Sequence, residues 1–429
     1  MSEGKNYKKW VTLVVLFVGS AVIFQLPYLR ETFYVPFTAA LGLTNEQFGM
    51  LTSVYATVSI FSYFFGGWLA DRVSVRKLFT FSFLSTGLVG IWFSTFPSYN
   101  TLLVIFGIMG VTTVLTYWPA FIKAIRNLGT SEEQGRMYGI AEGGRGVTSA
   151  VVVLLLQQLF FIIVQDNVTA DSSAEVLALS VVGLGWVLRI FSLLYIIIGI
   201  ITFVLVADDE KPEKKAEPLY KEIGKVILMP RVWFICLIIF TAYSIYALMA
   251  MFPKYMVDQY GMSTQLSMNM GAYRYIMQLF GGIAGGFLAD KIGSRIKVIT
   301  GGFFLLTASL IAFYFLPQTP ALLAYCIANF VILGVVVYSI RGLYFSIIDE
   351  AGIEKSSTGA TSGFASCVGY IPDVFLSAMV GSWIDSGVEG YGKMFLYAIA
   401  TCIAGIVVCF FFIRTVKKVG GPASAKIDN

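Results

Sequence analysis

Charged side chains stand inside segments that are otherwise apolar, and these are the residues best suited to do chemistry in this chain. Arg30 and Glu31 interrupt the apolar run that begins at Trp10, and Arg274 lies within a second apolar run. A charge inside a membrane is costly unless it is paired or lines a water-filled cavity, so such residues usually mark a functional site. A guanidinium stays protonated and presents a planar fork that matches carboxylate, phosphate or sulfonate oxygens. The arginines therefore predict a binding site for a negatively charged solute.

Further cations, acids and tyrosines extend this predicted site. The cations and tyrosines are assigned to the solute, because tyrosine can hydrogen-bond a polar ligand while packing like an apolar residue. The acids are assigned to ion pairs or to a coupled proton. The predicted substrate-binding residues are Arg30, Arg274, Tyr55, Tyr273, Arg341, Lys123 and Tyr338, and the predicted coupling or ion-pair residues are Glu31, Glu142, Arg145 and Asp373.

Several of these residues have a structural interpretation as well. Glu142 and Arg145 are three residues apart on one helical face and can neutralise each other. Lys123 is close enough to a membrane surface to extend its ammonium into water. Arg341 lies within reach of Asp349. Arg30 and Arg274 have no acid three or four residues away on their own helices, so they carry most of the prediction.

The composition shows which elements must position these residues. Hydrophobic residues make up 57% of the 429 residues and charged residues only 13%, against about 25% in soluble domains. The chain is therefore an integral membrane protein. It contains no histidine, which excludes imidazole as a base, proton carrier or metal ligand. Its five cysteines lie in apolar segments without paired spacing, so an enzyme, a metal site and a cofactor are not expected.

About 20 apolar residues are needed for a helix to cross the membrane, and the sequence has twelve segments of that kind. Turn signals separate them, among them a capping box at Thr44–Gln47. Pro372 precedes Asp373 within the eleventh segment and predicts a local irregularity in that helix. The predicted spans are 10–41, 45–69, 77–96, 101–126, 136–164, 176–206, 231–258, 264–289, 297–316, 320–346, 357–384 and 392–414.

Basic residues predict the orientation of these spans. The loops on the side of the two chain ends carry most of the Lys and Arg residues, whereas the opposite loops carry mostly Asp and Glu, which indicates that both termini are cytoplasmic. The expected location is a bacterial-type inner membrane, with lipid and a small organic anion as partners, no nucleic acid, and a monomeric state. The predicted organisation is an N-terminal six-helix bundle (1–206), a charged cytoplasmic linker (207–230), a C-terminal six-helix bundle (231–416) and a tail (417–429).

The two halves of the chain repeat each other. The stretch GGWLADR at Gly66–Arg72 recurs as GGFLADK at Gly285–Lys291, an offset of 285 − 66 = 219 positions. Self-similarity at half the chain length predicts two pseudo-symmetric bundles. With the twelve spans and the central linker, this loop closely resembles the signature loop of the major facilitator superfamily. The resemblance implies an all-α fold and alternating access, with gate residues at Asp71, Arg72, Arg76, Asp290, Lys291 and Arg295.

A second resemblance concerns the first span. PYLRETFYVPF, at Pro27–Phe37, is similar to the first-span pattern of the organophosphate:phosphate antiporters, in which Arg30 takes the place of the first anion-binding arginine. The seventh span departs from that pattern because it contains no arginine. Arg274 in the eighth span is the candidate replacement. A first-span arginine with basic residues in the fourth span is also similar to the anion:cation symporters of hexuronates and sialic acids, so phosphorylated, carboxylated and sulfonated solutes all remain candidates.

The expected function is secondary active transport of a small organic anion, coupled to protons or to a counter-anion. The alternative is an exporter of amphipathic or cationic compounds, which predicts a site rich in acids and poor in arginine. A receptor built on a transporter scaffold would need an additional sensory element. The excess of arginine and lysine among the charges within the spans favours the anion transporter.

Overall fold

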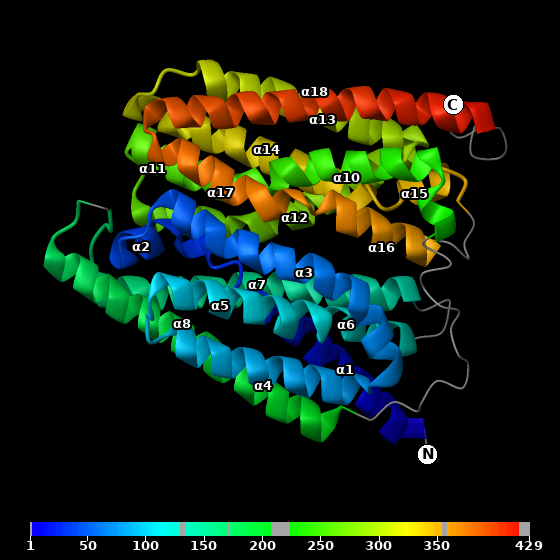
Figure 1. Ribbon diagram of the computed structural model, residues 1–429, viewed down its shortest axis with the longest axis horizontal. Coiled ribbons are helices and arrows are strands. Elements are labelled where there is room, and N and C mark those ends of the chain that lie inside the picture. The colour runs from blue at the N-terminus through cyan, green and yellow to red at the C-terminus, as the bar shows by residue number, and fades with distance from the viewer. Residues whose placement is uncertain (1, 129–133, 170, 207–223, 354–357, 420–429) are drawn as a thin grey trace. The chain divides into compact units, whose positions relative to one another are not determined.

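A computed structural model of the chain describes residues 2–128, 134–169, 171–206, 224–353 and 358–419. In these residues the secondary structure is helical throughout, which confirms the all-α fold class (Figure 1). The helices are α1 (Ser2–Val22), α2 (Arg30–Leu41), α3 (Asn45–Arg72), α4 (Val75–Phe93), α5 (Tyr99–Gly110), α6 (Trp118–Leu128), α7 (Gln134–Val164), α8 (Ala174–Leu205), α10 (Pro230–Leu248), α11 (Phe252–Tyr260), α12 (Thr264–Ile292), α13 (Arg295–Phe315), α14 (Leu323–Leu343), α15 (Ile347–Glu350), α16 (Thr358–Gly369), α17 (Pro372–Asp385) and α18 (Val388–Val419), with short π or 3₁₀ segments η1 (Val111–Leu115), η2 (Met249–Met251) and η3 (Pro320–Leu322).

Each predicted span corresponds to one helix or to a chain of helices broken by a short interruption. Among the described residues, eight helical stretches are long and apolar enough to cross a membrane, and Trp10–Val22 is a shorter apolar helix. The predicted capping box at the start of α3 is confirmed, since the Thr44 hydroxyl accepts from the Gln47 amide and the Gln47 side chain accepts from the Thr44 amide. The predicted irregularity before Asp373 is also confirmed, because α16 ends at Gly369 and α17 begins at Pro372.

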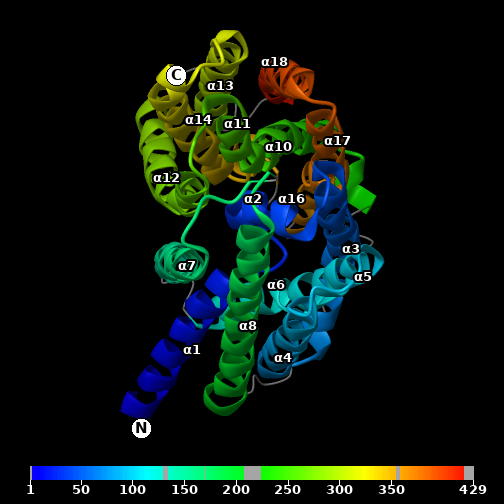
Figure 2. The same cartoon turned by 90° about the vertical axis from the view of Figure 1, so that its left-hand side faces the viewer.

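The chain divides into two compact units. Unit 1 consists of residues 1–213 together with 263–275, and unit 2 consists of residues 214–262 and 276–429, so that α12 begins in unit 1 and continues in unit 2. Within unit 1, α4 packs along α8, α1 along α7, and α3 along α5. Within unit 2, α18 packs on α10 and α13, and Figure 2 shows α13 beside α14. The predicted linker lies mostly outside the described residues, and the predicted domain limits stay a prediction.

The first predicted span is not a single helix, contrary to the expectation of a continuous 10–41 segment. Helix α1 ends at Val22, the chain turns through residues 23–29, and α2 begins at Arg30. Pro27 lies within the break and favours it, because proline lacks an amide hydrogen and its ring collides with the carbonyl four residues earlier. Pro36 lies inside α2 and acts in the same way on the backbone near Thr32. Phe33, between the two prolines, has non-helical backbone angles. The break therefore puts Arg30 at the first position of a new helix.

The seventh span, which is the sequence repeat of the first, is interrupted in the same region. Helix α10 passes into α11 through the 3₁₀ segment η2, and Pro253 follows directly. Met249, which opens η2, stands at the offset 249 − 30 = 219 from Arg30 and is fully buried. The position that matches Arg30 in the second half is thus apolar, so the two halves share a broken span but not its charge.

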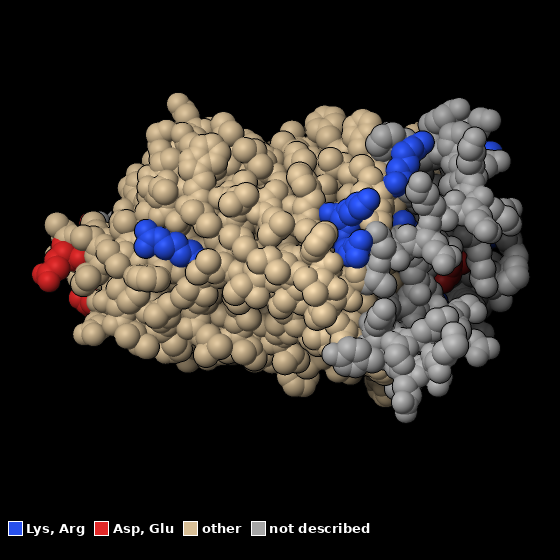
Figure 3. Space-filling view, turned by 90° about the horizontal axis from the view of Figure 1, so that it is seen from below, with Lys and Arg blue, Asp and Glu red and all other residues tan. Residues whose placement is uncertain are grey.

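The outer faces of the helices are apolar. On α4 and α8, Phe81, Leu88, Leu193 and Ile197 are all more than half exposed. On the face that Figure 3 shows, most of the described surface atoms belong to uncharged residues. Soluble proteins rarely expose so many large hydrophobic side chains to water, whereas membrane proteins present such a surface to lipid.

Candidate substrate-binding site

Three side chains hold the broken first span in place. The Tyr195 hydroxyl of α8 donates to the Val22 carbonyl at 2.6 Å and accepts from the Leu26 amide at 3.3 Å. Ser149 of α7 and Gln25 both donate to the Ala21 carbonyl, at 3.1 and 2.8 Å. A backbone group left unpaired in a low-dielectric interior is expensive, so these contacts take the place of the missing helical hydrogen bonds. The break is therefore stabilised by specific hydrogen bonds and is not a frayed helix end.

Removal of the Tyr195 hydroxyl should destabilise the protein. The Tyr195→Phe variant keeps the buried ring but leaves the Leu26 amide without its partner, and an unpaired buried group costs about 1–3 kcal/mol. The Val22 carbonyl loses one of its two hydrogen bonds and keeps the one from the Gln25 amide. We expect a lower midpoint of thermal unfolding in detergent. The control is Tyr325→Phe in α14, where the side chain is 64% exposed. Equal midpoints for the two variants would contradict this role of Tyr195.

Arg30, Glu31 and Arg274 all belong to unit 1 and are called the charged group here. Arg30 and Arg274 are 3% and 2% exposed. Both terminal nitrogens of Arg274 face the Glu31 carboxylate, Nη1 at 3.3 Å from Oε2 and Nη2 at 3.4 Å from Oε1. The structure thus joins a predicted substrate-binding arginine to a predicted coupling acid. Arg274 therefore already has a protein partner, and any anion that binds it must share its N–H donors with Glu31.

Gly271 allows this ion pair to form. A Cβ atom at Gly271 would collide with the backbone oxygen of Glu31 and would lie 2.9 Å from the Cα of Thr32. The α12 backbone therefore touches the α2 backbone one turn before Arg274. Only glycine permits an approach of this kind between two helices.

The predicted tyrosines have different surroundings. The Tyr55 hydroxyl is 3.0 Å from the Thr113 hydroxyl in the π segment η1, and its ring meets the Tyr28 ring edge to face at 5.5 Å. π segments inside helices are frequent at functional sites. Tyr273 is 36% exposed, whereas Tyr275, two residues later, accepts a hydrogen bond from Gln25 at 2.9 Å. On α12 it is therefore Tyr275, not the predicted Tyr273, that reaches the broken span.

Unit 2 holds a second charged group, built from tyrosines around Arg341. The Arg341 guanidinium lies over the Tyr246 ring at 3.8 Å from its centre and near the Tyr243 ring at 5.8 Å. The Tyr338 ring contacts Tyr246 at 5.9 Å. The Tyr243 hydroxyl donates to the buried Asp373 carboxylate at 2.6 Å. Cation–π contacts with Tyr246 and Tyr243 therefore hold the Arg341 guanidinium in place.

The remaining predicted residues lie elsewhere. Lys123 donates to the Ala70 carbonyl at 2.8 Å, which puts it at the predicted gate loop. Arg145 lies half-buried on α7, and the side chain of Glu142 is outside the described residues, as is that of Asp71. Among the other gate residues, Arg76 lies over the Phe203 ring at 5.6 Å, Arg72, Asp290 and Lys291 are exposed, and Arg295 is 3.9 Å from Glu350.

Sequence and structure comparisons agree on the family. The model of the Major Facilitator Superfamily matches residues 10–377. This chain belongs to the Major Facilitator Superfamily. It is 30% identical to the inner membrane protein YqcE of Escherichia coli strain K12, over 99% of this chain and 100% of that one. It is 21% identical to the hexuronate transporter of Bacillus subtilis strain 168, over 96% and 93% of the two chains. The crystal structure of a bacterial homolog of the human lysosomal transporter Spinster has a TM-score of 0.71 and 15% identity, covering 97% of this chain and 98% of that one.

These matches establish the chain as an integral inner membrane protein of a transporter family rather than an enzyme. They also confirm the predicted fold with its two repeated bundles of helices. The cytoplasmic orientation of the termini stays a prediction, and so do the roles of the individual site residues.

Some residues of this facilitator were missed by the sequence analysis. Glu350 of α15 is 1% exposed and accepts hydrogen bonds from the amides of Arg295 and Ile296 at 2.5 and 3.2 Å, so it caps the start of α13. Glu350 was not selected because it lies four residues after the predicted span 320–346, where a charged residue is expected. Arg189, in the middle of α8, was left out of the charges counted within the spans; it is exposed and lies over the Trp186 ring at 5.7 Å.

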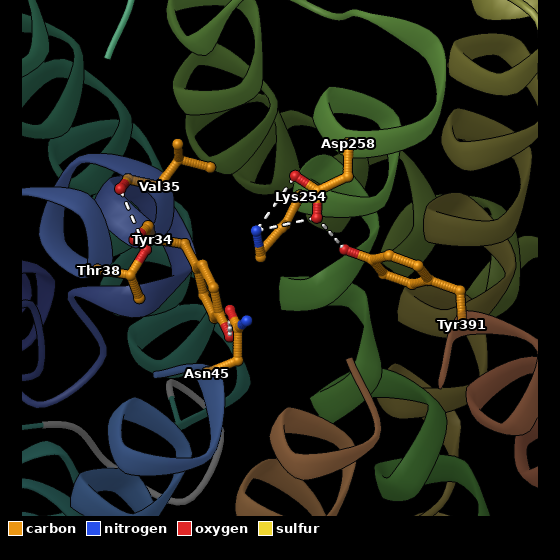
Figure 4. A network of polar contacts seen from close by, with 7 residues as sticks. All are labelled: Tyr34, Val35, Thr38, Asn45, Lys254, Asp258 and Tyr391. Carbon is orange, nitrogen blue, oxygen red and sulfur yellow. Dashed lines mark hydrogen bonds and ion pairs between the residues drawn. The ribbon is translucent and has the colours of Figure 1, made fainter. Parts of the chain in front are cut away.

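Figure 4 shows two further polar groups, one in each unit. In unit 2, the Asp258 carboxylate binds Lys254 at 2.9 Å and accepts from the Tyr391 hydroxyl at 2.5 Å, which links α11 to α18. In unit 1, the Tyr34 hydroxyl donates to the Asn45 side chain at 3.0 Å and links α2 to α3. The Lys254 and Asp258 side chains are 15% and 30% exposed, so we assign this ion pair a structural role only.

Proposed function

We propose that this facilitator carries a small organic anion across the membrane by alternating access, with Arg30 and Arg274 as the residues that bind its charged group. The cargo class is a phosphorylated, carboxylated or sulfonated metabolite. Arg341, with Tyr243, Tyr246 and Tyr338 around it, is the cation that unit 2 contributes to transport.

The observation that carries the proposal is the charge of the Arg30–Glu31–Arg274 group. Two guanidinium groups and one carboxylate give a net charge of 2 − 1 = +1, and both arginines are almost completely buried. A charge at the centre of a spanning helix costs about 2.5–3.5 kcal/mol on insertion scales, so it is retained for a function. A site for cationic or amphipathic drugs would need the opposite balance of charges.

The Glu31–Arg274 ion pair also supports coupling. An incoming anion that binds Arg274 competes with Glu31 for the same donors. If the displaced Glu31 takes up a proton, solute and proton move together. If it stays ionised, no proton moves with the solute, and coupling requires a counter-anion that binds Arg274 on the return step, as in an exchanger. The similarity to a protein named as a hexuronate transporter favours a carboxylated solute.

A ligand panel tests the proposal. Purified native protein should be heated with glucose 6-phosphate, glucuronate, ethanesulfonate, glucose and tetraphenylphosphonium, because a ligand bound only by the folded state raises the unfolding midpoint. At a concentration about 100 times its Kd, a ligand adds about 2.7 kcal/mol of stability. We expect anions alone to raise the midpoint. Stabilisation by glucose or tetraphenylphosphonium without stabilisation by any anion would refute the proposal.

Proteoliposomes then separate the two modes of coupling. Uptake of a stabilising anion driven by an inward proton gradient, in empty vesicles, identifies a symporter. Uptake that needs the vesicles to be loaded with an anion identifies an exchanger. Entry of the anion at equal rates with and without either gradient would exclude both modes.

A further inference from the structure

Gln157 of α7 is a buried amide with only half of its hydrogen-bonding capacity used. Its side chain is fully buried, and its Nε2 donates to the Met268 carbonyl of α12 at 2.6 Å. That contact fixes the orientation of the amide, because a carbonyl can bond only to the nitrogen. The opposite atom, Oε1, then has no donor within hydrogen-bonding distance on any residue that the structure describes. A buried acceptor without a hydrogen-bond partner is exceptional in a folded protein, and a bound ligand is one explanation for it.

The unpartnered oxygen lies at the level of Arg30. Two contacts define how α7 lies along the first span: Ser149 bonds to Ala21, and the Phe160 ring contacts the Phe33 ring. Between these contacts α7 advances by eleven residues and the first span by twelve. Helix α7 therefore runs parallel to the broken first span, and interpolation between these two contacts puts Gln157 at the level of Arg30 along the helix axis. On the third element, α12, the Gln157 amide binds Met268 and the backbone at Gly271 touches Glu31. The three elements that meet here all belong to unit 1.

Asn269 adds a second acceptor of the same kind. It directly follows Met268, and its Oδ1 is buried without a hydrogen-bond partner among the described residues. Two amide oxygens without donors among the described residues thus stand on α7 and α12, which meet where Gln157 binds Met268, and Asn269 is 274 − 269 = 5 residues before Arg274 on α12. Amide oxygens accept from O–H or N–H groups, and on a phosphorylated, carboxylated or sulfonated metabolite the neutral hydroxyl groups can supply these donors.

We propose that Gln157, assisted by Asn269, is a specificity-determining residue that accepts hydrogen bonds from hydroxyl groups of the transported anion. The inference rests on the proposed function, because it places these hydroxyls on a solute whose charge is held by Arg30 and Arg274. It selects hydroxylated anions, whether sugar acids or sugar phosphates, over unhydroxylated ones of equal charge. A site built to bond a hydroxyl rejects the analogue that lacks it, because its buried acceptor would then stay unpaired.

The test compares matched ligands on matched variants. Affinities of gluconate and hexanoate, which have the same chain length and charge, and of glucose 6-phosphate and hexyl phosphate are measured by the shift of the unfolding midpoint. In the native protein we expect the hydroxylated member of at least one pair to bind at least about tenfold more tightly. The pair that shows the difference tells a carboxylated from a phosphorylated cargo. Gln157→Met should remove the discrimination and leave the affinity for the unhydroxylated member unchanged.

The neighbouring residue provides the control. Gln158 follows Gln157 on α7 but is exposed, so Gln158→Met should retain native discrimination. Equal affinities within both pairs in the native protein would overturn the inference, even if Gln157→Met fails to fold, and would leave anion transport standing. Native discrimination in Gln157→Met would overturn it as well and would point to a buried water as the partner of Oε1. Absence of binding by all four anions would overturn the proposed function together with the inference.

Discussion

Replacement of Arg30 by methionine should abolish anion uptake. Hydrogen bonds to a charged group contribute about 1.5–3 kcal/mol each, so the loss of a two-pronged contact with the solute predicts a fall in affinity of at least about 100-fold. Arg30→Lys keeps the charge but loses the planar fork, and we expect it to recover only part of the uptake. The measurement is uptake of a stabilising anion into proteoliposomes, with binding followed in parallel by the unfolding midpoint.

Arg189→Met is the matched control for this experiment. It removes an arginine from another spanning helix, α8, where the side chain is exposed against Trp186. Uptake by this variant should match that of the native protein. If Arg30→Met transports as well as Arg189→Met does, the buried arginine at the break has a structural role and no part in recognising the anion.

Replacement of Gly271 by alanine should disrupt the charged group without removing any charge. The added methyl group would collide with backbone atoms of Glu31 and Thr32, which cannot rotate away, and overpacking of this kind costs about 1–3 kcal/mol. Separation of α12 from α2 would also pull Arg274 away from Glu31. We expect a lower unfolding midpoint and a loss of uptake from one methyl group.

The same helix offers the controls for that substitution. A Cβ at Gly282 or Gly286, further along α12, would meet nothing within 4 Å. Gly282→Ala and Gly286→Ala should therefore be neutral or slightly stabilising, since alanine favours a helix by up to about 1 kcal/mol relative to glycine. Equal unfolding midpoints for Gly271→Ala and these two variants would contradict the prediction, because they would show that α2 and α12 can move apart at little cost in stability.

The fold was largely predictable because its signals are local in the sequence. Apolar length gave the spans, and the recurrence of GGWLADR as GGFLADK gave the repeat. The break in the first span was less visible, although Pro27 and Pro36 are both in the sequence. Prolines are tolerated in spanning helices when neighbouring helices satisfy the freed backbone groups, so whether they bend or break a helix depends on residues far away. Tyr195 supplies that partner here.

The candidate site was predicted as a set of residue types but not as a set of contacts. Residue type and depth identified Arg30, Glu31 and Arg274, whereas their pairing depends on how α12 meets α2 at Gly271. The sequence repeat could not replace this information, because Met249 stands where a second copy of Arg30 would be. Gln157 carries no charge and therefore gave no signal in an apolar segment. Its importance follows only from which of its two amide atoms is already bonded.

The contact between Tyr195 and Val22 also constrains how the protein is made. These residues are 173 positions apart in the chain. At about 5–20 residues per second, a ribosome needs roughly 9–35 s to produce Tyr195 after Val22 has been synthesised. During that interval the Leu26 amide lacks the Tyr195 hydroxyl with which it pairs in the folded protein. The nascent chain must therefore keep this segment in a hydrated or protected environment, such as the insertion machinery, until α8 arrives.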